Sequence, residues 1–322
     1  MAYSSVLVAG GTGFIGGHLV ARLAETGVAI IVPTRHAERA RHLLVLPGVD
    51  VVEANVNDEA TLDRLLKNVD AVINLVGVLH SAAGPAGSPY GPGFAHAHVA
   101  LPRKIVAACG ANKVRRYLHM SALGADSKGP SMYSRSKADG ELAAKSDPAL
   151  AVTIFRPSVV FGEDDHFLNL FAHLQRILPV ILLGGANAKL QPVYVKDVAL
   201  AYVNALENPA AIGKTYEIAG PEVYTLRELV RLAGIYSGHS RPIIGLPEPL
   251  ARFMALLMEH MPGRPLMSRD NLASLKVDNV ASGPIDPALL PKPTPLEAIA
   301  PFCLRPRTGG VEEVVINPPT VL

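Results

Sequence analysis

The stretch VLVAGGTGFIGGHLVARL, residues Val6–Leu23, decides the fold. Val6–Ala9 is an apolar run that predicts a buried strand, and four glycines follow it: Gly10, Gly11, Gly13 and Gly16. Ile15, Leu19 and Leu23 then recur every four residues, as apolar residues do on one face of a helix. A strand, a glycine turn and a helix in that order are typical of the phosphate-binding corner of a dinucleotide fold.

Each glycine has an expected role in that corner. Gly10 lets the chain turn, Gly13 lets the backbone approach a pyrophosphate, and Gly16 lets the helix pack close to the strand. The helix N-terminus offers free N–H groups and a partial positive charge to the phosphates. The spacing is one residue wider at its start than G-x-G-x-x-G, and the glycines alone would also suit a structural turn. With the flanking strand and helix, we predict nucleotide contacts from Gly10, Gly11, Thr12, Gly13, Phe14, Ile15 and Gly16.

The composition favours a large α/β protein that lacks membrane-spanning helices. The 322 residues suffice for a nucleotide domain with a smaller partner, and 49% hydrophobic against 18% charged residues supplies a sizeable core. Mean hydropathy is high at +0.26, yet no apolar run approaches the ~18 residues of a transmembrane helix. The excess of apolar residues indicates a hydrophobic pocket, a surface that contacts a membrane or a partner interface.

The net charge indicates which partners to exclude, and the cysteines indicate the compartment of the protein. A formal charge of only +2 leaves no electrostatic footprint for nucleic acid. Cys109 and Cys303 form no pair motif, which indicates a reducing compartment. Because the first strand begins near Val6, no signal or transit peptide is expected. We predict a cytoplasmic protein, with peripheral contact to the inner membrane as an alternative; the oligomeric state stays open.

Alternating strands and helices continue after the glycine corner. The predicted strands are Val28–Val32, Val49–Val52, Ala71–Val76, Tyr117–Met120 and Val152–Phe155, and the predicted helices are Glu59–Lys67, His98–Cys109 and one that begins near Tyr133. Near-continuous apolar strands in this alternation predict an α/β fold: a Rossmann-type doubly wound parallel sheet with a smaller C-terminal substrate lobe. We assign residues 1–160 and 194–219 to the NAD(P)-binding domain, and 161–193 and 220–322 to the lobe.

The second half of the chain carries two further predictions. Val193–Val195 and Tyr216–Ala219 are expected to be late strands that return to the sheet. Helix Pro249–His260 carries a broad apolar stripe: Leu250, Phe253, Met254, Leu257, Met258 and Met261. Packing in the core is the favoured interpretation of that stripe; a lipid-like substrate, a membrane or a partner surface is the alternative.

The end of the second strand indicates the type of dinucleotide. An acidic residue at this place holds the ribose hydroxyl of NAD, whereas an arginine accommodates the 2′-phosphate of NADP. The strand runs into PTRH, without an acid and with Arg35, so we predict NADP(H) in preference to NAD(H). A solvated basic turn is the alternative interpretation of Arg35. The adenine and nicotinamide sides are assigned to residues at later strand ends: Asn55, Val56, Leu75, Val76 and Gly77.

Three residues are candidates for the chemistry. Tyr133 and Lys137 form Y-x-x-x-K, and a spacing of four puts both side chains on one helical face. An ammonium beside a phenol is expected to lower the pKa of the phenol, so that it can exchange a proton with a carbonyl or alcohol oxygen while hydride moves. Ser121 ends the fifth strand, where its hydroxyl is expected to bond the same oxygen.

These motifs together resemble those of the extended or atypical short-chain dehydrogenases/reductases, which are NAD-dependent epimerase/dehydratase-like proteins. The resemblance runs from Val6 to about Ala219 through GGTGFIG, NLVG, MSALGA, YSRSK, FRPSVVFG and PVYVKDVA. FRPSVVFGEDDHFLNLFA and SALGA are similar to the subfamily that includes the accessory NAD(P)-binding subunit of respiratory complex I and its bacterial relatives. That subunit is thought to hold its nucleotide structurally.

The resemblance also implies roles for individual residues. Ser121, Tyr133 and Lys137 correspond to the catalytic residues, with Tyr133 and Lys137 also touching the cofactor, and Arg35 to the NADP arginine. The FRPS motif adds three residues on the cofactor side: Arg156, Pro157 and Ser158. Two positions depart from the family pattern. Where many extended members have an asparagine that opens the helix after the fourth strand and supports a proton relay, this chain reads Ala97-His98-Val99, and Asn55 stands where an adenine-side aspartate is common.

Three functions remain open from the sequence. The first is an oxidoreductase acting on an apolar carbonyl or alcohol that is related to quinones or isoprenoids. The second is a non-catalytic nucleotide-binding subunit or assembly factor of a respiratory membrane complex. The third, a nucleotide-sugar epimerase or dehydratase, is weakened by the missing asparagine. Neither HAH at 96–98 nor DDH at 164–166 has enough spaced ligands for a metal, and Ser121 lacks a nucleophile elbow, so no metal site and no hydrolase are expected.

Overall fold

A seven-stranded sheet organises the N-terminal half of the chain. The computed structural model describes residues 3–85, 87–261, 263 and 265–305. All neighbouring strands are parallel, in the order β11-β6-β5-β4-β1-β2-β3. Their bounds are β1 (Ser5–Ala9), β2 (Ala29–Thr34), β3 (Val49–Glu53), β4 (Ala71–Asn74), β5 (Arg116–Met120), β6 (Ala151–Pro157) and β11 (Thr215–Ile218). The predicted Rossmann-type sheet is confirmed, and its order reverses between β1 and β4, where such sheets bind dinucleotides.

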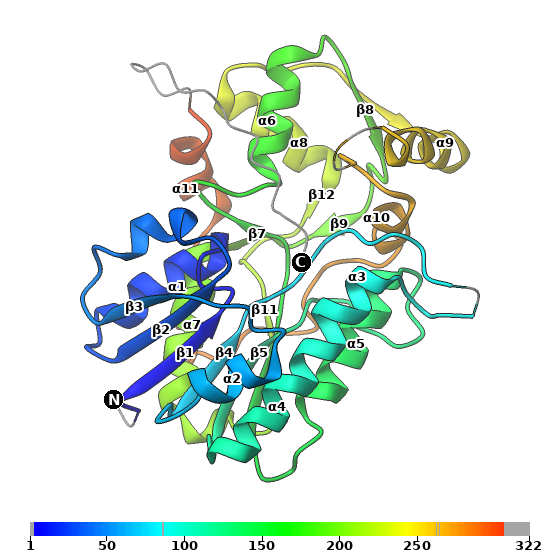
Figure 1. Cartoon of the computed structure of the whole chain (residues 1–322). Helices are drawn as coiled ribbons and strands as arrows, with labels where there is room; N and C mark the ends of the chain where they lie inside the picture. Colours follow the sequence, from blue (N-terminus) through cyan, green and yellow to red (C-terminus); the bar gives the residue numbers. More distant parts are fainter. Residues whose placement is uncertain (1–2, 86, 262, 264, 306–322) are drawn as a thin grey trace. The chain divides into compact units, whose positions relative to one another are not determined.

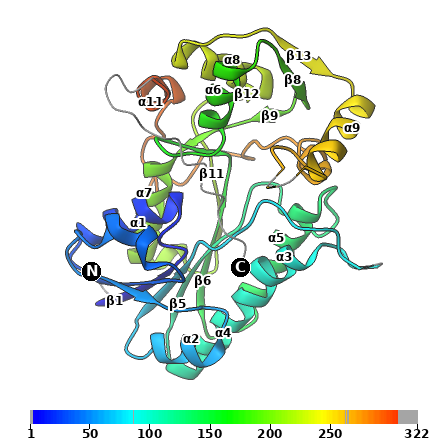
Figure 2. The ribbon, with the colours of Figure 1, turned by 45° about the horizontal axis from the view of Figure 1, so that its top comes forward.

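Helices cover both faces of this sheet (Figures 1 and 2). One face carries α1 (Phe14–Ala24) and α7 (Val195–Glu207), which pack on each other. The other carries α2 (Glu59–Leu65), α4 (Leu101–Asn112) and α5 (Met132–Ala144). Two short helical pieces precede α4: α3 (Pro92–Phe94) and the π-helix η2 (Ala95–Ala100). The 3₁₀ helices are η1 (Ala37–Leu43) and η3 (Pro209–Ala211).

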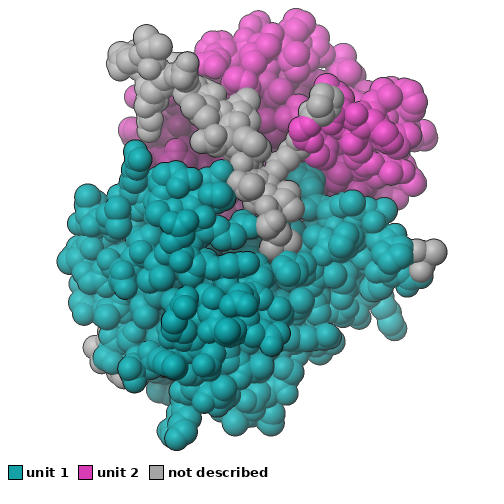
Figure 3. All heavy atoms as spheres, in the orientation of Figure 1, with its two compact units in different colours: residues 1–157, 195–218, 281–293 teal, residues 158–194, 219–280, 294–322 magenta. Residues whose placement is uncertain are grey.

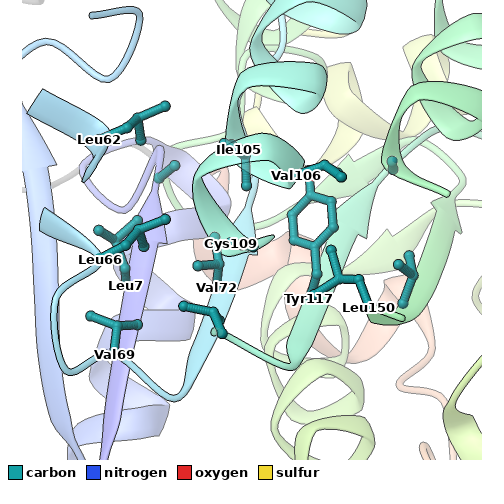
Figure 4. Close-up of a cluster of buried hydrophobic side chains, with 14 of the residues drawn as sticks. Leu7, Leu62, Leu66, Val69, Val72, Ile105, Val106, Cys109, Tyr117 and Leu150 are labelled. Atoms are coloured by element: carbon teal, nitrogen blue, oxygen red, sulfur yellow. The ribbon is translucent and has the colours of Figure 1, made fainter. Parts of the chain in front are cut away.

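The core under α2 and α4 follows from the alternation of side chains along the strands. Leu7, Val72 and Tyr117 of β1, β4 and β5 point to this face and are fully buried. Figure 4 shows them with residues of α2, of the turn that ends it and of α4: Leu62, Leu66, Ile105, Val106 and Cys109. Because successive strand residues face opposite sides, Arg116 lies under α7 instead. Its guanidinium donates to Ala205 O at 2.8 Å, which ties the sheet to the end of α7.

The chain divides into two compact units, coloured in Figure 3. Unit 1 consists of Met1–Pro157, Val195–Ile218 and Ala281–Pro293, and unit 2 of Ser158–Tyr194, Ala219–Val280 and Thr294–Leu322. Unit 2 contains α6 (Leu168–Ile177), α8 (Leu226–Ser237), α9 (Glu248–Glu259), α10 (Arg269–Ser274) and α11 (Leu296–Cys303). Its strands form three pairs: β7 (Val160–Phe161) with β10 (Val193–Tyr194), β9 (Lys189–Leu190) with β12 (Tyr224–Thr225), and β8 (Ile181–Gly184) with β13 (Ile243–Leu246). Residues 281–293, assigned from sequence to the lobe, fall in unit 1.

Two expectations for the second half were wrong. Val193–Val195 does not return to the large sheet, because only Val193 and Tyr194 are extended and they pair with β7. The apolar stripe of α9 is not buried in the core: Phe253 is 56% exposed and Leu257 54% exposed. The opposite alanine face packs instead, and Ala255 is fully buried. None of the helices among the described residues is both long and apolar enough to cross a membrane.

Candidate active site

The glycine corner has the geometry that its sequence predicts. Gly10 has a φ of +83°, in the left-handed region that side chains rarely adopt, so the tight turn needs glycine. A Cβ on Gly16 would collide with the carbonyl oxygen of Gly10 and lie 2.6 Å from the Cα of Gly11. Both neighbours are backbone atoms that cannot move aside easily. Gly16 therefore allows α1 to begin directly against the turn.

Gly13 differs from these two glycines because the protein leaves room around it. It precedes α1 with extended backbone, and a Cβ there would meet only the carbonyl oxygen of Gly10, at 3.3 Å. A side chain at this position would therefore require a much smaller shift of the protein than one at Gly16. The open space lies at the N-terminus of α1, where unpaired N–H groups favour an anion. This corner fits the pyrophosphate of a dinucleotide.

The predicted specificity residue lies at the carboxyl end of β2. Arg35 is exposed and directly follows β2. Thr34 just before it is buried, and its hydroxyl donates to His36 O at 3.2 Å, which shapes the turn that presents Arg35. The position suits a 2′-phosphate, and the preference for NADP(H) stays a prediction.

We expect Arg35→Ala to bring the affinities for NADP(H) and NAD(H) together. Losing one charge-assisted contact costs about 1.5–3 kcal/mol, which is about 10- to 150-fold in the Kd of NADP(H). Titration calorimetry with both nucleotides measures the change, and Arg64→Ala, an exposed arginine on α2, is the matched control. Equal affinities of the unaltered protein for the two nucleotides would contradict the prediction.

The ends of β3 and β4 carry the other predicted cofactor residues. Asn55 is exposed after β3, and its Oδ1 accepts the backbone N–H of Asn57 at 3.1 Å; Val56 lies between them. Leu75, Val76 and Gly77 follow β4, beside the glycine corner: a Cβ on Gly10 would lie 3.2 Å from Leu75 C and Val76 N. Leu75, Val76 and Gly77 therefore lie where the sheet order reverses, between β1 and β4, whereas Asn55 and Val56 follow the edge strand β3.

Tyr133 and Lys137 share one side of α5, as predicted. Ser131 caps the helix by accepting the backbone N–H of Ser134 at 3.1 Å. Lys137 is 5% exposed; its Nζ donates to Met120 O at 3.2 Å and lies 5.8 Å from the centre of the Tyr133 ring. A Cβ on Gly77 would lie only 3.1 Å from this Nζ. Y-x-x-x-K and the end of β4 are thus brought together in unit 1.

Burial is the main cause of the shifted pKa values of Tyr133 and Lys137. It raises the pKa of Tyr133 to about 12 and lowers the pKa of Lys137 to about 8, the latter against the opposing charge of Glu141. The predicted lowering of the pKa of Tyr133 by the lysine is therefore not what this structure gives, because desolvation of the phenol outweighs the nearby ammonium. At neutral pH the tyrosine is a proton donor and the lysine is mostly charged.

The hydroxyl of Ser121 has a partner in the protein. Its hydroxyl donates to Glu141 Oε1 at 2.5 Å. Arg156 binds the same carboxylate with two bonds of 2.7 Å, from Nε and Nη2. Glu141 lies two helical turns beyond Tyr133 on α5, about 12 Å along the axis. A catalytic role for Ser121 stays a prediction, since the structure gives its hydroxyl a buried structural partner.

Ser121→Ala tests that partnership. We expect the free energy of unfolding to fall by about 1.5–3 kcal/mol, because a buried carboxylate loses a donor. Chemical denaturation measures it, with Ser146→Ala as a control, since the exposed Ser146 donates only to the carbonyl oxygen of Ala143. Unchanged stability together with lost turnover would instead assign Ser121 to the chemistry.

The remaining residues of the FRPS motif also have protein partners. Arg156 is held by Glu141, and Pro157 ends β6. Ser158 belongs to unit 2, where its hydroxyl donates to Asn279 Oδ1 at 2.6 Å. Cofactor contacts by these three residues stay predictions. Among the described residues, no group of three His, Cys, Asp or Glu could hold a metal ion.

The role of His98 in the site was not predicted from the sequence. The residue is 1% exposed, its Nε2 accepts the N–H of Val78 at 3.0 Å, and its Nδ1 lies 2.8 Å from Ser136 Oγ. Its ring packs edge-on to Tyr133, with ring centres 5.6 Å apart. The departure from asparagine at this position was the only signal in the sequence.

Comparisons with known proteins agree with this architecture. A model of the NAD dependent epimerase/dehydratase family matches residues 6–219. The mitochondrial NADH dehydrogenase (ubiquinone) 1 alpha subcomplex subunit 9 of Arabidopsis thaliana is 33% identical over 291 residues, 85% of this chain and 70% of the relative. The 2-alkyl-3-oxoalkanoate reductase of Stenotrophomonas maltophilia is 27% identical over 250 residues, 70% of this chain and 73% of the relative.

A solved structure shows the same fold. The UDP-glucuronic acid 4-epimerase of Bacillus cereus, in complex with UDP-glucuronic acid and NAD, superposes with a TM-score of 0.68 at 20% identity, over 93% of this chain and 98% of that chain. The family match covers the glycine corner, the helix that carries Y-x-x-x-K and all seven strands of the large sheet except for Ser5 at the start of β1. The chain therefore belongs to the NAD dependent epimerase/dehydratase family.

Proposed function

We propose that the protein is an NADP(H)-dependent oxidoreductase that acts on an apolar carbonyl or alcohol of the quinone or isoprenoid type. The observation that carries this proposal is the position of Lys137, which lies beside the Tyr133 ring and next to Gly77 after β4. A proton donor and a buried ammonium thus stand beside the strand end where the family holds its cofactor. Nucleotide storage would use the lysine alone, whereas a proton donor beside it favours catalysis.

The residues present fit a dinucleotide. The open space at Gly13 and the N-terminus of α1 suit the pyrophosphate. Arg35 stands where it would bind a 2′-phosphate, and Lys137 where it would hold ribose hydroxyls. When bound, the cofactor supplies or accepts a hydride.

The proton chemistry falls to the residues of α5. In the direction of reduction, Tyr133 Oη donates its proton to the substrate oxygen as the carbonyl carbon gains hydride, which yields an alcohol. With a pKa of about 12 the phenol holds this proton at neutral pH. Lys137 Nζ stabilises the resulting phenolate, and general acid catalysis of this kind contributes about 10²–10⁴-fold to the rate.

The relatives support the apolar substrate and also an alternative. One of them is named as a reductase of 2-alkyl-3-oxoalkanoates, which are ketones with alkyl chains. Another is named as a subunit of mitochondrial NADH dehydrogenase and is more similar, at 33% identity. That similarity favours a second candidate function: a nucleotide-binding subunit or assembly factor of a respiratory membrane complex, in which the site does not turn over.

Purification and assay separate the two candidates. The nucleotide bound to the purified protein is identified by mass spectrometry, and oxidation of NADPH and NADH is followed with alkyl ketones and quinones of graded chain length. We expect NADP(H) to be bound and NADPH to be consumed with at least one apolar acceptor. Tightly bound nucleotide without turnover, together with co-purification with a membrane respiratory complex, would replace the first candidate with the second.

A further inference from the structure

The backbone around His98 has an uncommon form. The residue lies in the π-helix η2, where the chain takes a wider turn before α4 begins. π-helical turns are rare in proteins, and those that occur are often found at functional sites. Here the turn packs closely on α5, because a Cβ on Gly140 would collide with the carbonyl oxygen of His98. This close backbone contact therefore fixes where the His98 side chain leaves the backbone, next to α5, the helix that carries Tyr133.

The hydrogen bonds define which ring nitrogen carries the proton. The N–H of Val78 can only donate, so Nε2 of His98 is the acceptor of this 3.0 Å bond. The proton of the neutral ring is then on Nδ1, which donates to Ser136 Oγ at 2.8 Å. Ser136 Oγ in turn donates to Tyr133 O at 2.8 Å. Three bonds in sequence thus connect the loop after β4 with the backbone of Tyr133.

This arrangement requires a neutral imidazole. Burial, with the neighbouring ammonium of Lys137, holds the pKa of His98 well below its ordinary value. A protonated ring would have two donors and would leave the N–H of Val78 without an acceptor. The ring is also fixed by packing, since it stacks on Phe94 at 5.3 Å and meets Tyr133 edge-on.

His98 also borders the same glycine as the catalytic lysine. A Cβ on Gly77 would lie 3.5 Å from His98 Nε2 and 3.1 Å from Lys137 Nζ. The imidazole and the ammonium therefore flank the backbone at the end of β4. A change in one of them alters the space available beside the other.

We propose that His98 is a positioning residue that sets the loop Gly77–Val78 and the helix of Tyr133 at a fixed separation, and so shapes the nicotinamide side of the dinucleotide site. This inference rests on the proposed function for its effect on turnover, but its effect on nucleotide binding does not depend on turnover. The bond to Val78 serves the nucleotide, because it holds the loop beside the cofactor. The bond to Ser136 serves Tyr133, because it ends on the backbone of that residue.

Two amide substitutions separate the two bonds. An asparagine amide reaches about as far as Nδ1, so His98→Asn keeps a donor for Ser136 and loses the acceptor for Val78. A glutamine amide reaches about as far as Nε2, so His98→Gln keeps the acceptor for Val78 and loses the donor for Ser136. Ser136→Ala breaks only the second connection. His96→Gln, a change in the same π-helix at a half-buried position, is the matched control.

The experiment measures the Kd of NADPH by fluorescence titration, kcat with the best acceptor, and the melting temperature. We expect His98→Asn to raise Kd about tenfold with kcat within about twofold of the unaltered protein. His98→Gln and Ser136→Ala should lower kcat about tenfold with Kd within about twofold. His96→Gln should change neither.

Equal effects of His98→Asn and His98→Gln on Kd would overturn the proposal, as would a lower melting temperature with unchanged Kd in His98→Asn. If the protein binds NADPH and turns over no acceptor, the proposed function fails, while the difference in Kd between His98→Asn and His98→Gln still decides the role of His98.

Discussion

Turnover is expected to fall by about 100-fold or more when Tyr133 is replaced by phenylalanine, with the Kd of NADPH changed less than about threefold. The substitution removes the transferable proton and keeps the ring that packs against His98 and Phe94. General acid catalysis by a positioned side chain is worth about 10²–10⁴-fold, which sets the size of the loss. An interaction needed only in the transition state lowers kcat and kcat/KM together.

Steady-state kinetics and calorimetric titration on the same preparation measure both quantities. Tyr224→Phe is the matched control, because its hydroxyl donates to Glu297 at 2.7 Å in unit 2 and is not part of the site. Lys137→Ala should lower both turnover and nucleotide affinity. Full activity of Tyr133→Phe would reject the catalytic assignment and favour the role as a subunit of a respiratory complex.

Loss of nucleotide binding without loss of the fold is the expected result of Gly13→Val. Around Gly13 a Cβ meets only one protein atom within 4 Å, at 3.3 Å, so the new side chain fills the space assigned to the pyrophosphate. We expect the Kd of both NADP(H) and NAD(H) to rise by more than about 100-fold, which is about 2.7 kcal/mol. The melting temperature of the unliganded protein should stay within a few degrees.

Gly16→Ala should behave differently, because its new methyl group would collide with backbone atoms of the turn itself. Overpacking of this kind costs about 1–3 kcal/mol or more, so both stability and binding should fall. Gly17→Ala is the control: its Cβ meets only the His42 side chain, at 3.3 Å, and alanine favours the helix by up to about 1 kcal/mol. Normal nucleotide binding by the Gly13→Val variant would show that the pyrophosphate does not bind beside Gly13.

The sequence predicted the sheet well because its evidence is local. Apolar runs of four to six residues, the glycine turn and the i, i+4 spacing of Tyr133 and Lys137 each depend on neighbours in the chain. The same reasoning placed the end of β3 within one residue and Arg35 directly after β2, whereas the fourth strand ends at Asn74, two residues before the predicted Val76. Each of these features survives in the structure because no distant contact competes with it.

Features that depend on distant partners were not predictable in the same way. Ser121 directly follows β5, but only the fold shows that its hydroxyl donates to Glu141, which also binds Arg156. The periodicity of α9 identifies its apolar stripe, yet the small alanine face packs more closely, since Gly184 leaves room for Ala251. The role of His98 became clear only from the structure, in which the N–H of Val78 and the hydroxyl of Ser136 lie at its two ring nitrogens.

The discontinuity of unit 1 has a consequence for synthesis on the ribosome. The face of the sheet that carries α1 is completed by α7, and the edge beside β6 by β11, both from the segment Val195–Ile218. Residues 281–293 arrive later still, and Leu289 O accepts a bond of 2.8 Å from Asn204 Nδ2 of α7. A nascent chain that has emerged as far as residue 194 therefore displays an apolar sheet face that α1 covers only in part. In that interval the growing polypeptide exposes surface that favours aggregation.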